Sequence, residues 1–459
     1  MLPEGFRKRI LTQKYIDSES LLKSLEEPSP VSIRLNRKKW SAKPFDSEKV
    51  PWASDGYYLN VRPSYTLDPL FHAGCYYPQE ASSMFLEKVF EQLADKTRDL
   101  RVLDLCGAPG GKSTHLSSLI GTSGLLVCNE VISARANILS ETLTKWGGTN
   151  VIVTQNDPSD FGKLAGYFDI IVVDAPCSGE GMFRTEIARS EWSEANTAHC
   201  ADRQRRILHD IWPALKENGL LVYSTCTFNP SENEENIKWL TGETGSVSIE
   251  VDISGLAGIK EIDLNGVKRY AFHPDKIKGE GFFIAAVRKN EKVMPGRVFS
   301  MKKEQIRIPK TETEELKSFF DFDEERLIKW NDLFLLLNCR KEDYNILKQN
   351  LRIVKHGTRL AVLMKNKPVP EHDIAMSATA KLRAFPRIDI SYEEAIAYLR
   401  RDNLKLNASE RGFNIVSYKN VPLGWVNNIG NRINNYYPVE WRIRMQKADL
   451  SENSIINWE

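Results

Sequence analysis

The stretch LRVLDLCGAPGGK, residues 100–112, restricts the fold of this chain more than any other feature. An apolar strand runs into a turn that contains Gly107, Gly110 and Gly111, and a helix follows directly. Four more apolar strands alternate with helical stretches as far as GLLVYSTCT, residues 219–227. Because five consecutive strand–helix units imply a parallel sheet covered on both faces, we predict a doubly wound α/β fold.

The 459 residues exceed what one hydrophobic core supports, so we expect several domains. The sheet pattern occupies residues 66–292 and ends with SVSIEVDI and GFFIAAVRK, which we expect to form an antiparallel edge. A polar segment with prolines, residues 293–312, is predicted to be a linker. We expect an intermediate domain at 313–384, a small compact unit at 385–459 and an N-terminal RNA-binding extension at 1–65.

Basic residues concentrate at both ends of the chain, although the net charge is only +2. Residues 340–447 contain 20 Lys and Arg against 10 Asp and Glu, and residues 1–45 contain 10 against 5. Such flanks are typical of proteins that bind a polyanion such as RNA. Solvated faces of ordinary helices would produce the same counts, and charge alone leaves both interpretations open.

Other features indicate a cytoplasmic protein without a metal site. No apolar run is long enough to cross a bilayer, and the N-terminus MLPEGFRKRI lacks the apolar segment of a secretory signal. The seven cysteines are odd in number and include no CxxC pair. They fit neither a disulfide framework nor the usual zinc spacings, so we expect free thiols.

The glycine turn after the first strand predicts a nucleotide-like ligand, because glycines allow close approach of the backbone at a helix N-terminus. A phosphate-binding NTPase loop is the alternative, since the turn ends in Gly-Lys-Ser. That motif needs glycine at position 106, which is Cys106 here. For a methyl-donor site, Glu130 at the end of the second strand suits the ribose hydroxyls, and Asp157 at the end of the third suits the adenine amino group.

Cys177, in DAPC, and Cys226, in STCT, stand at the ends of the fourth and fifth strands. We expect both strands to lie beside the first, so that both thiols and Asp174 face the same crevice. Methylation of carbon 5 of a pyrimidine requires a thiolate, because this carbon is unreactive until a nucleophile adds to carbon 6. It also requires an acid near ring nitrogen 3, for which Asp174 is placed, and a base for the carbon 5 proton.

DLCGAPGGK, DAPCSGEGMFR, YSTCTFNPSENEENI and GEGFFIAAVRK resemble, in this order, the RNA cytosine-5 methyltransferases of the Sun family, particularly the bacterial branch that acts on small-subunit ribosomal RNA. The resemblance covers residues 66–292 and implies a Rossmann-like sheet that binds S-adenosylmethionine. It implies that Cys226 is the nucleophile, that Cys177 helps to release the product and that Lys112 reaches the target base. The donor-binding positions that it implies are Cys106, Gly107, Ala108, Pro109, Gly110, Gly111, Lys112, Glu130, Asp157 and Asp174.

The C-terminal stretch VPLGWVNNIGNRINNYYP resembles the PUA-like RNA-binding unit of the same branch and lies within the basic segment. We therefore expect a monomeric enzyme that methylates carbon 5 of a cytosine in 16S ribosomal RNA, either naked or in an assembling small subunit. The alternatives are a tRNA cytosine-5 methyltransferase, an RNA-binding ribosome-assembly factor without activity, and an ATPase that acts on RNA.

Overall fold

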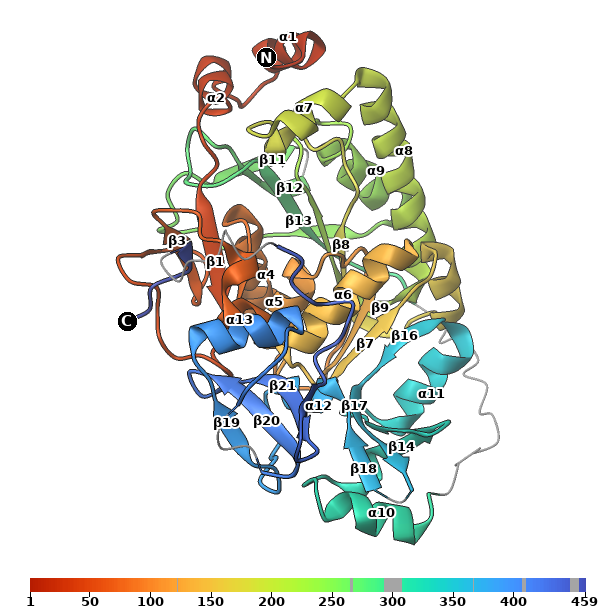
Figure 1. Ribbon diagram of the computed structural model, residues 1–459. Coiled ribbons are helices and arrows are strands. Elements are labelled where there is room, and N and C mark those ends of the chain that lie inside the picture. Colours follow the sequence, from red (N-terminus) through yellow and green to blue (C-terminus); the bar gives the residue numbers. More distant parts are fainter. Residues whose placement is uncertain (122, 265–266, 293–307, 366, 407–409, 446–453) are drawn as a thin grey trace.

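The computed structural model describes residues 1–121, 123–264, 267–292, 308–365, 367–406, 410–445 and 454–459. Most of the predicted linker, residues 293–307, lies outside the described residues. Within the described chain, the largest sheet has ten strands and occupies the centre of the molecule (Figure 1).

The middle of this sheet is parallel, as predicted. Its order is β7, β6, β5, β8, β9, and each neighbouring pair is parallel. The fourth strand, β8, lies beside the first, β5. Strand β9 lies between β8 and β13 and does not touch β5, so the expectation that both strands flank the first is wrong for β9. The strands are β5 (Arg101–Asp104), β6 (Leu125–Asn129), β7 (Val151–Thr154), β8 (Phe168–Asp174) and β9 (Leu215–Thr225).

Helical segments connect these strands. They are α5 (Gly111–Leu119), α6 (Ser133–Trp146), η3 (Pro158–Leu164), η4 (Glu180–Met182), α7 (Glu186–Glu191), α8 (Glu194–Ile211) and η5 (Trp212–Ala214). Helix α9 (Glu234–Thr244) follows the last parallel strand.

Both edges of the central sheet are antiparallel. On one side β13 (Phe282–Arg288) pairs with β9, and β10 (Val247–Ile249) pairs with β13, which confirms the two expected final strands. The hairpin of β11 (Lys260–Leu264) and β12 (Val267–Phe272) continues this edge and was not expected. At the other edge β16 (Ile353–His356) pairs with β7. The domain boundaries remain a prediction, but the sheet takes in a strand from beyond residue 292.

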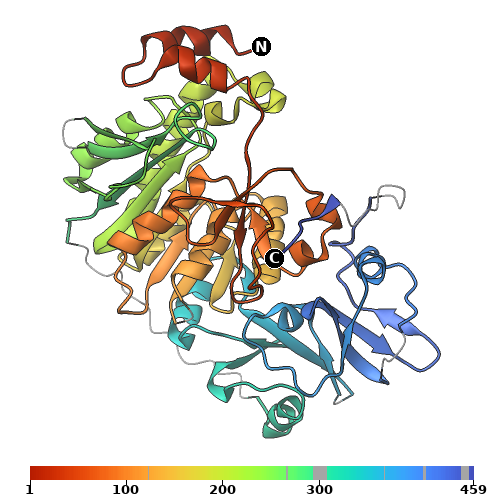
Figure 2. The ribbon, with the colours of Figure 1, turned by 90° about the vertical axis from the view of Figure 1, so that its left-hand side faces the viewer.

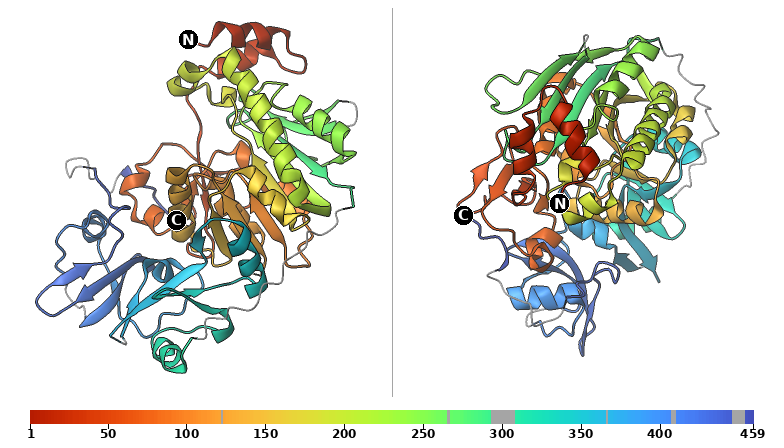
Figure 3. Two further views of the ribbon diagram at one scale, coloured as in Figure 1. Left: turned by 90° about the vertical axis from the view of Figure 1, so that its right-hand side faces the viewer. Right: turned by 90° about the horizontal axis from the view of Figure 1, so that it is seen from above.

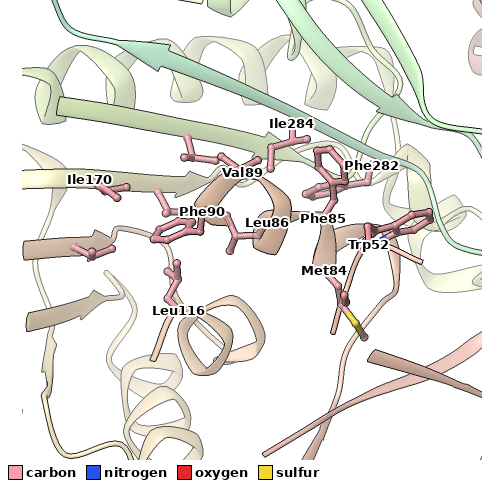
Figure 4. Packing of buried hydrophobic residues seen from close by; sticks show 14 of the residues in the cluster. Trp52, Met84, Phe85, Leu86, Val89, Phe90, Leu116, Ile170, Phe282 and Ile284 are labelled. Carbon is pink, nitrogen blue, oxygen red and sulfur yellow. The ribbon is translucent and has the colours of Figure 1, made fainter. Parts of the chain in front are cut away.

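Side chains alternate between two cores on the faces of the sheet. On β5, Val102 belongs to one core and Leu103 to the other. The first core is covered by α4 (Leu86–Leu93) and α5, whose side chains pack against Ile170 and Ile284 (Figure 4). The second core includes Leu337, Tyr344, Leu347 and Leu351, which follow the predicted linker. The C-terminal half therefore completes the core of the central sheet.

The N-terminal part consists of two helices and a small sheet of order β2, β3, β1, β4. Helices α1 and α2 lie beside α7 at the end of the molecule opposite the C-terminal sheets (Figure 3, left). The elements are α1 (Glu4–Thr12), α2 (Ser18–Ser24), β1 (Val31–Leu35), β2 (Glu48–Lys49), β3 (Gly56–Leu59), η1 (Tyr65–Leu67), α3 (Pro69–His72), β4 (Tyr76–Pro78) and η2 (Ser82–Phe85).

Two further four-stranded sheets follow the predicted linker (Figure 2). The first comprises β14 (Leu327–Trp330), β15 (Leu333–Leu336), β17 (Thr358–Met364) and β18 (Lys367–Pro370), with α10 (Lys310–Lys317), η6 (Glu324–Arg326), α11 (Lys341–Asn350) and α12 (His372–Met376). The second comprises β19 (Arg387–Asp389), β20 (Gly412–Tyr418), β21 (Val421–Asn428) and β22 (Ile433–Asn435), with α13 (Tyr392–Arg400). The second sheet shares a core with β1 and β3, so the two ends of the chain pack together.

Candidate active site at the carboxyl ends of the central strands

The predicted donor loop joins β5 to α5. Gly110 is the N-cap of α5 and has a φ of +118°, a value that L-residues rarely adopt. A Cβ at Gly110 would also lie 2.6 Å from Cγ2 of Thr142. The sequence therefore needs glycine at this position to bring the loop against α6. Cys106 packs against the second core, and burial raises the pKa of its thiol.

Asp104, the last residue of β5, was not among the predicted site residues. Its Oδ2 accepts a hydrogen bond of 2.6 Å from Ser113 Oγ, which ties the strand end to α5. Its Oδ1 is buried and has no hydrogen-bond partner among the described residues. Burial raises the pKa of Asp104 to about 7, although the Ser113 bond opposes this shift. Its position before the glycine turn was the one sequence signal for it.

Glu130 and Asp157 lie at the ends of neighbouring strands, as predicted. The Glu130 carboxylate is buried, accepts from the Ile132 backbone N–H at 3.0 Å and lies 3.3 Å from Nη2 of Arg135. Asp157 is more exposed and caps η3 through Ser159 N at 3.1 Å. Asn129 joins the strand ends, because its Nδ2 donates to the carbonyls of Leu105 and Asn156.

Lys112 and Asp174 form an ion pair, with 2.9 Å between Nζ and Oδ2. Asp174 also accepts a hydrogen bond of 2.8 Å from Ser224 Oγ on β9. Burial by itself would lower the pKa of Lys112, but the negative charge and hydrogen bond of Asp174, with a smaller contribution from Cys226, raise it. Lys112 is therefore a cation at neutral pH, and its Nζ lies 5.2 Å from the centre of the Phe282 ring.

Cys177 and Cys226 lie in contact beside this ion pair. Their Sγ atoms are 3.1 Å apart, and the Cys226 backbone N–H donates to the Cys177 sulfur at 3.3 Å. Both side chains are partly exposed. The hydrogen bond with Cys226 and burial raise the pKa of Cys177 well above its ordinary value. Cys177 is therefore a thiol at neutral pH, and its S–H can donate a hydrogen bond to the Cys226 sulfur.

The N-terminal helices cover the loops that carry the cysteines. Arg9 on α1 binds the fully buried carboxylate of Glu180 at 2.5 Å, and Gln13 donates to the Phe228 carbonyl at 2.8 Å. Apolar residues of α1 and α2 share a small core with Phe183 and Phe228. We predicted an RNA-binding extension here, and nothing in the structure tests that role. The observed contacts are with the loops that carry Cys177 and Cys226.

Three family models match the chain. They are the 16S rRNA methyltransferase RsmB/F at residues 91–288, the N-terminal domain of 16S rRNA methyltransferase RsmF at 2–81 and the methyltransferase RsmF PUA domain at 385–443. The ribosomal RNA small subunit methyltransferase F of Shewanella loihica is 30% identical over 448 residues, which cover 92% of this chain and 91% of that protein. The chain belongs to the RsmF family of 16S rRNA methyltransferases.

Further relatives agree with this assignment. The RsmF protein of Klebsiella pneumoniae is 29% identical over 95% of this chain and 96% of its own length. A solved methyltransferase homologue from Pyrococcus horikoshii is 29% identical, with a TM-score of 0.53, covering 62% of this chain and 95% of that one. NSun6 from Pyrococcus horikoshii, solved with SFG, has the same TM-score and 22% identity, covering 63% and 99%, and supports the fold alone.

RsmF membership confirms the Rossmann-like methyltransferase sheet, the C-terminal PUA-like unit and the broad prediction of an RNA methyltransferase. Within the described residues, no helix is long and apolar enough to span a membrane. In the same part of the chain, no group of three or more His, Cys, Asp and Glu side chains is arranged to hold a metal ion.

Proposed function

We propose that this RsmF protein transfers a methyl group from S-adenosylmethionine to carbon 5 of a cytosine in 16S ribosomal RNA, through a covalent adduct with Cys226. The observation that carries the proposal is the contact of two thiols beside the Lys112–Asp174 ion pair. Methyl transfer to nitrogen or oxygen needs no thiol, whereas carbon 5 chemistry needs one nucleophile and a second group for release.

The strand ends have groups that suit the donor. The buried Glu130 carboxylate and the Asp157 carboxylate are hydrogen-bond acceptors for ribose hydroxyls and an adenine amino group, and the left-handed Gly110 keeps the loop free of side-chain bulk. When bound there, S-adenosylmethionine would supply an electrophilic methyl group. The loop residues Cys106, Gly107, Ala108, Pro109, Gly110, Gly111 and Lys112 would surround it.

Cys226 would act as the nucleophile on carbon 6. The Lys112 ammonium lies close enough to Cys226 for the charge of Cys226 to contribute to the raised pKa of Lys112. Formation of the carbon–sulfur bond makes carbon 5 enamine-like and able to accept the methyl group. As the sulfur adds to carbon 6, the proton of the Cys226 thiol would pass by way of the Asp174 carboxylate, which Lys112 and Ser224 hold, to ring nitrogen 3, so that no net negative charge remains on the ring.

Product release requires loss of the carbon 5 proton to a base. The electron pair of that C–H bond re-forms the C5–C6 double bond, and the carbon–sulfur bond breaks to leave the Cys226 thiolate. Cys177 is the thiol in contact with Cys226 and is our candidate for assisting this step. Its raised pKa keeps Cys177 a thiol, so its S–H can donate a hydrogen bond to the Cys226 sulfur as the carbon–sulfur bond breaks and negative charge develops there, while a separate base takes the carbon 5 proton.

Bisulfite sequencing of RNA from cells with and without the gene tests the proposal. One 16S cytosine should lose its protection from conversion in the deletion strain, and wild-type protein should restore it. A protected site in tRNA instead would support the tRNA alternative. If no cytosine changes its conversion, the remaining alternative is an RNA-binding ribosome-assembly factor without activity.

Calorimetry with S-adenosylmethionine and with Mg-ATP separates a methyltransferase from an ATPase. Monomeric state and cytoplasmic location stay predictions.

A further inference from the structure

Glu232 lies in the segment NPSENEEN, just after β9, and its side chain is fully buried. Its carboxylate accepts hydrogen bonds from the Ser178 backbone N–H at 2.8 Å and from Ser178 Oγ at 2.5 Å. It also accepts from Gln204 Nε2 at 3.1 Å and from Thr227 Oγ1 at 3.4 Å. One carboxylate thus has partners on two loops and on α8.

The two loops are those that carry the cysteines. Ser178 directly follows Cys177, and Thr227 directly follows Cys226. The hydroxyls of Ser178 and Thr227 also lie 3.0 Å apart. The bonds from Ser178 and Thr227 therefore each fix a residue adjacent to a cysteine. Glu232 itself forms no bond with either sulfur among the interactions of the described residues.

Helix α8 strengthens this connection. Gln204, which is fully buried, donates through Nε2 both to Glu232 and to the carbonyl of Pro176 at 2.9 Å. Asn236 donates to Gln204 Oε1 at 2.9 Å and so holds the amide in this orientation. Glu232 therefore holds both neighbours of Cys177: Ser178 directly, and Pro176 through Gln204.

Stability alone is a poor reason for a carboxylate at this place. No Lys, Arg or His lies within ion-pair distance of Glu232 in the described residues. Burial without a cation is costly even when hydrogen bonds offset part of the cost, and it raises the pKa of Glu232. Apolar packing would hold the loops at lower cost but would not fix their register through directional bonds.

We propose that Glu232 is a positioning residue that sets the spacing and register of Cys177 and Cys226, and that this spacing lets the two thiols serve successive steps on one cytosine. The inference rests on the proposed function. Both steps act on neighbouring carbons, so a shift of either loop by about 1 Å would impair catalysis strongly. RNA and donor binding should be retained, because the fully buried Glu232 side chain is not available to contact either of them.

The test compares full-length wild type with Glu232→Gln. Glutamine has the same size but only one carbonyl oxygen, so it cannot accept from the Ser178 backbone N–H and from the Ser178 hydroxyl at the two separate positions that the carboxylate offers. Glu235→Gln is the matched control, because Glu235 is exposed three residues further along. We expect kcat of Glu232→Gln to fall roughly 10- to 100-fold. Its KM for RNA and for S-adenosylmethionine should stay within about twofold of wild type, as should all constants of the control.

A second readout reports thiol spacing without catalysis. Diamide, an azo oxidant, takes two electrons and two protons from the two thiols, becomes a hydrazine and leaves one sulfur–sulfur bond. Mass spectrometry of tryptic peptides follows formation of the Cys177–Cys226 disulfide. It should form several-fold more slowly in Glu232→Gln than in wild type or Glu235→Gln.

Wild-type kcat and wild-type disulfide rates in Glu232→Gln would overturn the inference. Equal losses of kcat, donor binding and RNA binding would also overturn it, since they indicate a general structural role. If Glu232→Gln does not fold, Ser178→Ala removes one of the hydroxyl bonds and should show the same kcat and disulfide effects at smaller size. If wild type methylates no cytosine, the proposed function fails, while the diamide arm still measures whether Glu232 sets the thiol spacing.

Discussion

The Sγ atoms of Cys177 and Cys226 lie 3.1 Å apart although 49 positions separate them in the chain. Strands β8 and β9 are parallel neighbours, and each cysteine lies in the loop at the carboxyl end of its strand. The contact therefore follows from the sheet topology. Single substitutions can separate the roles of the two thiols, as the first prediction describes.

Cys226→Ala should bind RNA and donor but form neither product nor covalent adduct, because no nucleophile reaches carbon 6. Cys177→Ala should form the adduct and release it slowly, so a protein–RNA species should accumulate on a denaturing gel. The species should require S-adenosylmethionine if the stalled adduct is the methylated one. The double variant should lack the adduct. An adduct with Cys226→Ala and none with Cys177→Ala would reverse the two roles.

Glu130→Ala should weaken donor binding by roughly 1 to 3 kcal/mol, the usual cost of leaving a ligand group without its buried partner. Asp157 has a second role as the N-cap of η3, so Asp157→Ala should also lower thermal stability. Asp157→Asn keeps the cap and serves as the control for stability. Isothermal titration measures the donor affinity, and wild-type affinity in both alanine variants would contradict the placement of the donor.

Asp104→Asn should change the pH dependence of stability. The pKa of Asp104 is about 7 in the folded chain and near 3.8 when unfolded, so the folded state binds the proton more tightly. Asp104 therefore makes the free energy of unfolding fall as pH rises from about 4 to about 7, by about 1.4 kcal/mol per pH unit at most. Urea titrations at several pH values should show a flatter profile in Asp104→Asn. Parallel profiles would contradict this.

Charge reversal at Arg411 and Arg432 should weaken RNA binding. Both are exposed on the second C-terminal sheet, and an added Cβ at Gly430 would lie 3.2 Å from Nη2 of Arg411, beside the β21–β22 turn. If both arginines contact phosphates, the double variant Arg411→Glu, Arg432→Glu should show a weaker salt dependence of RNA binding. The slope of log affinity against log salt concentration should fall by roughly one per lost contact. Lys238→Glu, exposed on α9, is the control. An unchanged slope would exclude this face.

Leu347→Ala should destabilise the central sheet, although Leu347 lies far beyond residue 292. Its side chain is fully buried in the second core, so we expect a loss of about 2 to 5 kcal/mol. Hydrogen exchange should show reduced protection of β7, with which β16 pairs. Gln349→Ala, exposed on the same helix, is the control. Loss of protection confined to residues 308–365 would indicate an independent domain.

The parallel strands, the glycine loop and the convergence of Asp174 with the two cysteines at one edge could be predicted, since strand periodicity and glycine turns are local signals. The Lys112–Asp174 ion pair could not, because it joins the start of α5 to the end of β8. β16 could not, because four residues with mixed burial do not reveal that they complete a distant sheet edge. Asp104 and Glu232 also escaped prediction. Their importance lies in burial and in partners on other elements, which spacing along the chain does not encode.

The contact of the N-terminal helix with the loops that carry Cys177 and Cys226 affects how the chain folds during synthesis. Arg9 and Glu180 are 171 positions apart, and Gln13 and Phe228 are 215 apart. The first helix therefore leaves the ribosome long before its binding surface exists, and it docks only after β9 has been made. Because such long-range contacts form late, the loops that carry both thiols receive their cover near the end of folding.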